Sequence, residues 1–453
     1  MKFERLRQKV LEENYPSEQE LEEIEQKYRE ISAFIEKEFD QSTHFAGSAG
    51  RATCMKDDRD IDIFVLFPES VDPEELEQRA LEIGKKTFKE FDGKHHVEYA
   101  EHPYVKGRID GFKVEIVPCY DTGPESIKSS VDRTPHHTRW TEENLSDRQR
   151  KDVVVLKKFL DAGGLYGSSL KVRGFSGYLC EILVSESGSF RQLVEEAASW
   201  SEDEVLYPAG YYEEKLPSEL EEKFSRDELV VIDPVDPERN VASVLSTENY
   251  SKFIYRCWRF QSNPGMNYFR SDETEYSEFE VKQELKRRSD FMLVEFENID
   301  DVDDIVYPQL RKALRRLKSE LEEKSFRIYE SGFYVGQTTK IFFEMDRKLP
   351  EVQEKDGPKV FHGRDHLEQF SSKYSNIYVE EDRIKAKTER EFTDAREFLQ
   401  HFLKEGDLEK KGVPDRVAEK LEDFSFASPL EGDSEWFNYL GEKLKIQHGE
   451  NDG

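Results

Sequence analysis

The chain has 453 residues, of which 36% are hydrophobic, so its length suits about three domains with buried cores. Its 98 acidic and 67 basic residues give a net charge of −31, opposite in sign to the usual charge of an RNA-binding protein. Four widely spaced cysteines without a Cys-x-x-Cys pair disfavour both structural zinc and a disulfide framework. The apolar stretches are too short for a membrane span and the first residues lack a signal region, so we expect a soluble, cytoplasmic protein without membrane association.

One hypothesis keeps nucleic acid as a partner of this acidic chain. In high intracellular salt the screening length shrinks to a few ångströms, so long-range repulsion from RNA matters little. Local basic clusters could then bind phosphates, and the candidates are Arg148, Arg150 and Lys151, then Lys171 and Arg173, then Arg311, Lys312, Arg315 and Arg316.

The first predicted element is an amphipathic helix, because apolar residues repeat at helical spacing from Leu21 to Ile35. The stretch Phe45–Arg51 follows, with Gly47 and Ser48 between a short apolar segment and residues able to start a helix. Free backbone N–H groups and a hydroxyl converge at such a turn, which favours an anion such as phosphate.

Asp60 and Asp62 lie two residues apart in a strand candidate that runs to Phe67. Strand side chains alternate between faces, so both carboxylates point the same way. Two like charges this close need a cation between them, and hard oxygen ligands suit Mg²⁺ carrying substrate phosphates. If the strand candidate at 112–118 pairs beside this one, its Glu115 completes a two-metal site for in-line displacement at phosphorus. We expect Glu115 to be mostly buried, because its neighbours are apolar.

Taken singly, these motifs have ordinary structural interpretations. A Gly-Ser turn is usually just a loop, and an Asp-x-Asp pair is more often a solvated turn than a metal site. Their joint order and spacing are much more specific.

The first 145 residues predict a mixed α/β catalytic unit, with a helix over 73–91 and strands over 96–101 and 112–117. From 146 to 262 helices dominate, and the turn-rich segment 261–265 marks a boundary.

Beyond the boundary, strand and helix patterns suggest an α/β module that could be an RNA-binding sheet, with elements at 291–296, 307–324, 326–335 and 340–345. Its aromatic residues Tyr334, Phe342 and Phe343 could stack on bases, although core packing is the more common role for such residues.

The turn and the carboxylates resemble those of the polymerase-beta-type nucleotidyltransferase superfamily. Most of residues 40–260 further resembles the archaeal class of CCA-adding enzyme, a tRNA nucleotidyltransferase, through the segments 79–85, 99–105, 117–120, 130–135, 171–181, 233–236 and 239–242. The resemblance implies an α+β fold with a polymerase-beta-like mixed-sheet catalytic domain, a helical central domain, and a carboxyl-terminal α/β RNA-binding module with a helical tail, over residues 1–145, 146–262 and 263–453.

The resemblance also implies residue roles. Ser48 and Arg51 would contact the triphosphate, and the Mg²⁺ ligands would be Asp60, Asp62 and Glu115. Further nucleotide-binding positions would be His137, Lys157, Tyr166 and Arg239. Glutamate replaces the family's usual aspartate at 115, and the turn has Ala49-Gly50 in place of the commoner sequence. Both changes keep the donors and the charge, so we expect activity to survive them.

Three of these positions also have simpler interpretations. Lys157 lies in a helix candidate, where a lysine is usually solvated. His137 could be an ordinary loop histidine, and Tyr166 could serve packing alone.

The activity implied is template-independent addition of C, C and A to the 3′ end of tRNA from CTP and ATP, with release of pyrophosphate, by a protein that often forms homodimers. Two alternatives stay open. One is a poly(A) polymerase or another transferase of the superfamily, and the other is a noncatalytic RNA-binding protein on the same scaffold.

Overall fold

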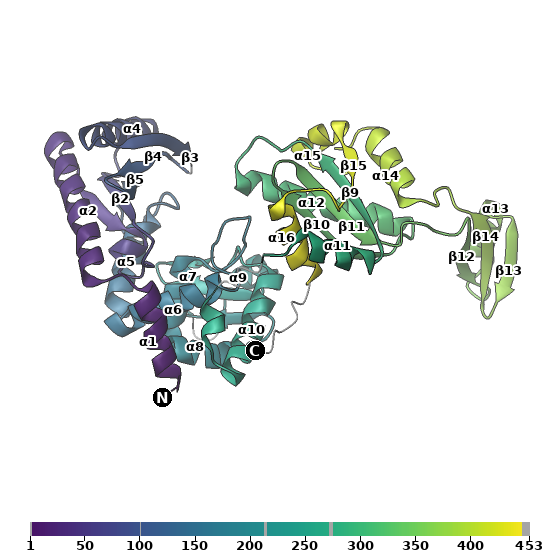
Figure 1. The fold of residues 1–453 in the computed structure, drawn as a ribbon, viewed down its shortest axis with the longest axis horizontal. Helices are drawn as coiled ribbons and strands as arrows, with labels where there is room; N and C mark the ends of the chain where they lie inside the picture. The colour runs from purple at the N-terminus through teal and green to yellow at the C-terminus, as the bar shows by residue number, and fades with distance from the viewer. Residues whose placement is uncertain (1, 100, 213–214, 271–274, 446–453) are drawn as a thin grey trace. The chain divides into compact units, whose positions relative to one another are not determined.

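The computed structural model describes residues 2–99, 101–212, 215–270 and 275–445 (Figure 1). The chain divides into two units, Met1–Asp272 and Glu273–Gly453. Helices and sheets occur in both, which confirms the predicted α+β class. In the described part of the chain, every helix is too short or too polar to cross a lipid bilayer.

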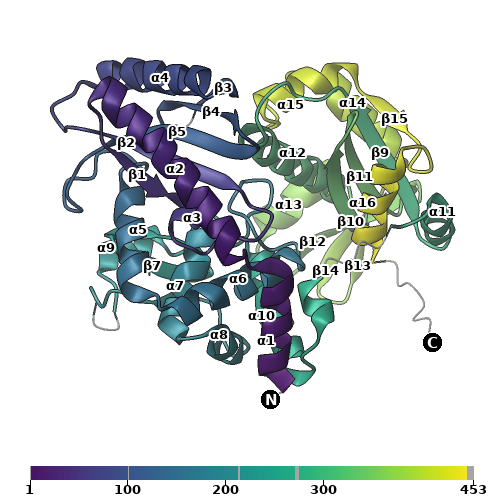
Figure 2. The same cartoon turned by 60° about the vertical axis from the view of Figure 1, so that its left-hand side comes forward.

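The first unit begins with a mixed sheet whose strands lie in the order β1-β2-β5-β4-β3. These strands are β1 (Thr43–Ala46), β2 (Asp60–Phe67), β3 (Lys94–Tyr99), β4 (Pro103–Ile109) and β5 (Phe112–Tyr120). β2 and β5 are parallel, and the other neighbouring pairs are antiparallel. Helices α2 (Glu18–Phe39) and α4 (Pro73–Glu90) lie side by side over one face of this sheet (Figure 2).

Alternation along β2 decides which side chains meet those helices. Ile61, Ile63 and Val65 are fully buried in the core beneath α2 and α4. Asp60 and Asp62 therefore point to the opposite face. The predicted helix around Leu21 to Ile35 and the strand from Asp60 to Phe67 are confirmed.

Helices form the rest of the first unit, around a core rich in phenylalanine. They are α1 (Lys2–Asn14), α5 (Arg133–Asn144), α6 (Asp147–Asp161), α7 (Gly177–Ser187), α8 (Phe190–Ala197), α9 (Ser218–Lys223) and α10 (Thr247–Ser262). A small sheet accompanies them, with β6 (Glu204–Leu206), β7 (Leu229–Asp233) and β8 (Asp236–Asn240).

This helical core extends further along the chain than the turn at 261–265 suggests. Phe269 follows that turn and is 2% exposed, because it packs among Phe159, Phe190 and Phe260. The first unit accordingly ends at Asp272. Val10 on α1 joins the same core and so ties the start of the chain to the helices.

The second unit is built on a sheet with the order β10-β11-β9-β15. Its strands are β9 (Asp290–Phe296), β10 (Ile328–Val335), β11 (Thr339–Met345) and β15 (Ser425–Ala427). One face packs on α12 (Asp303–Glu323), α14 (Ala395–Lys404) and α15 (Asp415–Lys420). The other packs on α11 (Glu278–Lys286) and α16 (Ser434–Leu444).

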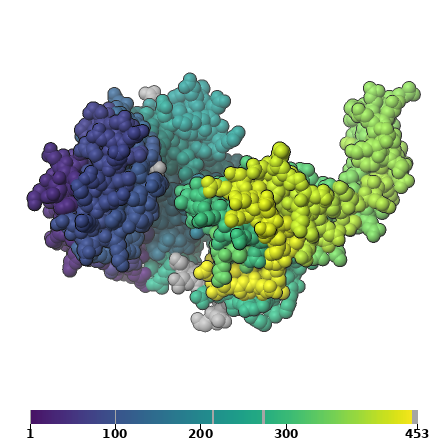
Figure 3. Space-filling model, turned by 90° about the horizontal axis from the view of Figure 1, so that it is seen from above, coloured from purple at the N-terminus to yellow at the C-terminus, as the bar shows by residue number. Residues whose placement is uncertain are grey.

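A separate small sheet of this unit has the order β12-β14-β13 and carries α13 (Arg364–Lys373). Its strands are β12 (Val352–Lys359), β13 (Asn376–Glu380) and β14 (Arg383–Glu389). Figure 3 shows it in light green as a distinct lobe of the unit. Its strands are rich in charged residues and bury few side chains, among them Ile384 and Ala386.

The cysteines are all free and buried: Cys54, Cys119, Cys180 and Cys257. Burial raises the pKa of every one of these thiols, to about 11 for Cys54 and about 12 for Cys180.

The aromatic residues of the second sheet serve the core. Phe342 and Phe343 are fully buried on opposite faces of β11, and Tyr334 packs on Trp436 and Tyr439. Core packing, rather than base stacking, is therefore the role of the two phenylalanines.

Phe342→Ala should destabilise the protein by about 3–5 kcal/mol, because it leaves a cavity between β11 and α16. Urea denaturation followed by circular dichroism measures the loss. Phe279→Ala is the matched control, since the Phe279 side chain is 69% exposed and its removal should change stability little. A Phe342→Ala protein of normal stability but weaker RNA binding would contradict the core assignment.

Candidate active site

The Gly-Ser turn joins β1 to the short helix α3 (Gly47–Gly50), as its sequence predicts. Gly47 has a φ of +70°, and a Cβ atom there would lie 1.7 Å from Oδ2 of Asp62. Only glycine therefore allows the turn to approach the carboxylate this closely. The Ser48 hydroxyl donates to Oδ2 of Asp58 at 3.4 Å.

The predicted carboxylates come together on the face of the sheet opposite α2 and α4. The parallel register of β2 and β5 sets Asp62 directly beside Glu115, with Asp60 two residues earlier on β2. Asp58, which the sequence motif does not include, lies close enough to Asp60 for burial and that neighbour to raise its pKa to about 6. Asp58 and Asp62 thus lie against the Gly47 turn, and Asp60 and Glu115 lie beside them.

Two lysines offset part of this negative charge. Lys106 on β4 lies 2.8 Å from Glu115, and Lys113 on β5 lies 2.9 Å from Asp60. Only 27% of the Glu115 side chain is exposed, and most residues of β5 are buried, as expected. The partner that a buried carboxylate needs is Lys106, which the adjacent β4 brings beside it.

Ionisation of Asp62 is disfavoured by both burial and neighbouring carboxylates. Burial, followed by the charges of Glu115 and Asp60, raises the pKa of Asp62 to about 7, although Arg51 acts in the opposite direction. A divalent cation beside this carboxylate would favour its ionised form and offset the repulsion from its neighbours.

The donor set fits a hard divalent metal, since carboxylate oxygens are the ligands such ions prefer. Among the residues that the structure describes, no three His, Cys, Asp or Glu side chains are already grouped to hold a metal ion. Asp60 and Glu115 instead form ion pairs with Lys113 and Lys106.

Arg51 ends the turn and is buried against a second acidic group. Its Nε lies 2.8 Å from Oε2 of Glu181, a fully buried residue of α7. Thr53 and Thr141 also donate their hydroxyls to Glu181. These bonds lower the pKa of Glu181 against the effect of burial, so it stays ionised and fixes Arg51.

Lys157 is completely buried, so the interpretation of a solvated surface lysine is wrong. Residues 152–157 of its helix α6 are all buried, and the Lys157 Nζ donates to the Thr53 carbonyl at 2.8 Å. Burial lowers the pKa of Lys157. A Cβ at Gly177 would lie 3.4 Å from Lys157 Nζ and 3.3 Å from the Tyr166 hydroxyl, so both predicted residues reach the start of α7.

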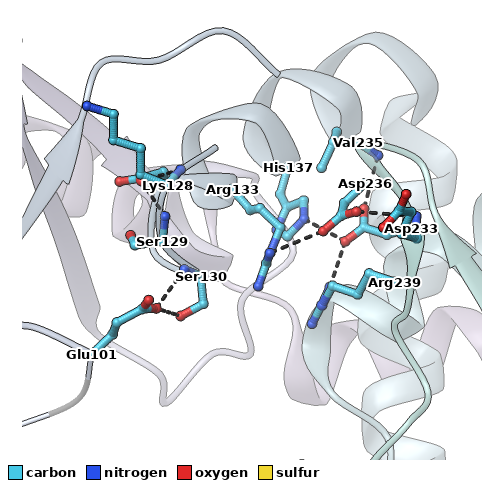
Figure 4. Close-up of polar contacts among 12 residues, drawn as sticks. Glu101, Lys128, Ser129, Ser130, Arg133, His137, Asp233, Val235, Asp236 and Arg239 are labelled. Carbon is cyan, nitrogen blue, oxygen red and sulfur yellow. Dashed lines mark hydrogen bonds and ion pairs between the residues drawn. The ribbon is translucent and has the colours of Figure 1, made fainter. Parts of the chain in front are cut away.

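His137 and Arg239 meet at a third buried carboxylate, Asp233 (Figure 4). Oδ2 of Asp233 accepts from His137 Nε2 at 3.0 Å and from Arg239 Nη1 at 2.6 Å. His137 lies on α5, so it is not a loop histidine, and its ring stacks on Tyr178 with 3.9 Å between centroids.

The cluster of His137, Tyr178, Asp233 and Arg239 lies within reach of the charge on Arg51, which ends the Gly-Ser turn. Arg51 acts on the pKa values of both His137 and Tyr178, and burial is the main reason that the pKa of His137 is lowered. Arg51 is thus near enough to act on both the Asp62 carboxylate and the His137 cluster.

Sequence reasoning missed three residues that hold this region together. They are Asp58, Glu181 and Asp233. Glu181 and Asp233 lie inside segments that carry the family resemblance, so their position in the sequence was an available signal. Their burial depends on tertiary contacts.

The raised pKa of Asp62 predicts a pH-dependent effect of Asp62→Asn on stability. Because this pKa lies above the value of about 3.9 for an exposed aspartate, the folded state favours the protonated form, so stability falls as pH rises from about 4 to about 7 and stays at the lower level above that. In EDTA, Asp62→Asn should raise Tm by about 2 °C or more at pH 8 and leave it unchanged at pH 4, as measured by thermal melting.

Glu30→Gln is the control for that experiment. Glu30 is exposed and pairs with Lys27, which lowers the pKa of Glu30, so this variant should gain no stability at pH 8. An equal effect of Asp62→Asn at both pH values would contradict the electrostatic assignment.

Family models match three parts of the chain. Residues 21–137 match a nucleotidyltransferase domain, residues 151–270 match the second domain of tRNA nucleotidyltransferase, and residues 287–425 match the C-terminal domain of CCA-adding enzyme.

Similar proteins extend this likeness to most of the chain. A CCA-adding enzyme of Methanocaldococcus jannaschii is 35% identical, over 92% of this chain and 94% of that one. The CCA-adding enzyme of Archaeoglobus fulgidus is 35% identical, over 89% and 90%. That of Haloarcula marismortui is 37% identical, over 78% of each.

A solved structure of the Cid1 poly(U) polymerase overlaps 58% of this chain and 95% of its own, with a TM-score of 0.46 and 14% identity, and the assignment does not rest on it. It rests on relatives 35–37% identical over most of their length. The predicted family is confirmed: the chain belongs to the archaeal CCA-adding enzymes, which are tRNA nucleotidyltransferases.

Proposed function

We propose that the protein adds C, C and A to the 3′ end of tRNA from CTP and ATP without a nucleic-acid template. The observation that carries the proposal is the register of β2 and β5, which sets Glu115 beside Asp62 at the Gly47 turn. In a member of this family, that arrangement suits attack of an RNA 3′-hydroxyl on the α-phosphorus of a nucleotide, with pyrophosphate leaving.

We infer that the metal is Mg²⁺ and that Asp60, Asp62 and Glu115 are its ligands. When bound, the metal would lower the pKa of the primer hydroxyl and offset charge on the triphosphate. The elevated pKa of Asp62 supports this site, because a divalent cation would neutralise the crowded carboxylates.

The remaining predicted residues would bind and orient the nucleotide. Ser48 and the backbone of α3 would hold phosphate oxygens, and Arg51 would offset their charge while Glu181 keeps its guanidinium in place. The other four positions of the proposed nucleotide site are His137, Lys157, Tyr166 and Arg239.

We also propose the division of labour along the chain that its sequence suggests. Residues 1–145 would supply catalysis, 146–262 nucleotide and primer binding, and 263–453 tRNA binding. A cytoplasmic location and a homodimer belong to the same proposal, as does an acidic surface adapted to high salt.

The direct test incubates the purified protein with tRNA lacking its 3′ terminus, Mg²⁺, and CTP or ATP, singly and together. Sequencing of the product ends should show CCA only when both nucleotides are present. The assay is repeated from dilute buffer to molar KCl, because the acidic surface predicts better activity at high salt. Homopolymeric A tails would indicate a poly(A) polymerase instead. RNA binding without any extension would indicate a noncatalytic protein.

Gly47→Ala should reduce nucleotide incorporation by at least about 100-fold, because the new methyl group displaces the Asp62 carboxylate. The rate of labelled CMP addition to tRNA measures the effect.

Gly164→Ala is the matched control for this prediction. Gly164 has a similar φ of +66°, but a Cβ there would meet nothing within 4 Å. It should suffer only backbone strain of about 1 kcal/mol and keep its activity. Equal losses in the two variants would show that strain, rather than the contact with Asp62, is responsible.

A further inference from the structure

Asp233 joins two segments of the proposed nucleotide site at a single carboxylate. Its side chain is 0% exposed, and its two carboxylate oxygens accept four hydrogen bonds. Oδ2 accepts from His137 and Arg239, while Oδ1 accepts from the Tyr178 hydroxyl at 3.3 Å and the Val235 N–H at 3.0 Å. Figure 4 shows the His137 and Arg239 side chains converging on it from α5 and β8.

The partners of Asp233 differ in how far they can reach a ligand. The Arg239 side chain is 35% exposed and has five N–H donors, of which Nη1 supplies one to Asp233. The His137 side chain is 12% exposed, and donation from Nε2 leaves Nδ1 as an acceptor whenever the ring is neutral. Both groups thus keep hydrogen-bonding capacity that Asp233 does not use.

We propose that Asp233 is a positioning residue, whose buried carboxylate sets the orientation of Arg239 and His137 for nucleotide binding. This inference rests on the proposed function, which assigns both residues to the nucleotide site. Because Asp233 is enclosed by its partners, it acts through them rather than by contact with substrate.

Replacement by asparagine tests the charge and the acceptor pattern with little change of volume. An asparagine has one acceptor oxygen, and its NH₂ group must take the place of Oδ1 or Oδ2. In place of Oδ2 it faces the donors of Arg239, and in place of Oδ1 it faces the Val235 N–H. Either orientation sets one donor against another, so the arrangement around Arg239 or the β7–β8 turn must shift.

Asp236→Asn is the matched control. Asp236 lies three residues further along, its side chain is 26% exposed, and it pairs with Arg133 at 3.1 Å. Its Oδ1 accepts from a backbone N–H in the same turn, as does Oδ1 of Asp233. Asp236 thus shares the backbone bond of Asp233, but its side-chain partner is Arg133 rather than Arg239 or His137.

The experiment measures the Kd of CTP and of ATP in Mg²⁺ by equilibrium dialysis on the full chain, with incorporation into tRNA measured separately. Asp233→Asn should raise both Kd values about tenfold, the loss expected for a misplaced charge-assisted hydrogen bond, and Asp236→Asn should leave them unchanged. The KM for nucleotide should rise by the same factor, while the KM for tRNA stays constant.

A double-mutant cycle separates positioning from general structural damage. If Asp233 acts through Arg239 as well as through His137, the variant with both Asp233→Asn and Arg239→Ala should lose clearly less affinity than the sum of the two single losses. Additive losses, or unchanged Kd values in Asp233→Asn, would overturn the inference.

The outcome for the proposed function is distinct. Wild-type protein that binds CTP but never extends tRNA would refute the proposed function, and a tenfold weaker Asp233→Asn would still support positioning at a nucleotide site. Wild-type protein that binds neither nucleotide would overturn both.

Discussion

The parallel pairing of β2 with β5 is the constraint on which the rest of the site depends. It sets Asp62 and Glu115 in the same register position, so their charges must coexist on the open face of one sheet. The backbone of Gly47 also lies directly against the Asp62 carboxylate. Charge repulsion of this kind opposes folding, and the protein retains it where a divalent cation would remove it.

A second principle concerns the buried carboxylates that lie away from the sheet. Glu181 fixes Arg51 near the Gly-Ser turn, and Asp233 fixes Arg239 and His137 further along. Each has several donors, so each stays ionised although burial disfavours its charge. Glu181 comes from α7 and Asp233 from β7, so elements outside the catalytic sheet orient these side chains.

Short-range patterns explain how much of this was predictable. The period of two in β2 placed Asp60 and Asp62 on one face, and the Gly47-Ser48 turn predicted the start of a helix. The sequence could not reveal the burial of Lys157, because a lysine among valines and leucines looks like the solvated edge of a helix until α7 covers it. The strands β4, β12, β13 and β14 were not predicted. Polar and charged residues interrupt the alternation of apolar and polar positions that identifies a strand in a sequence. The end of the first unit was equally hidden, since Phe269 packs back beyond a turn-rich segment.

The burial of the four thiols has a practical consequence for following this enzyme in action. Cys54, Cys119, Cys180 and Cys257 are enclosed and hard to ionise, so maleimide dyes should react with them slowly. Cysteines introduced at exposed positions of each unit would then be labelled selectively in an otherwise native chain. Energy transfer between such dyes could record how the separation of the two units changes as the growing RNA end advances by each nucleotide.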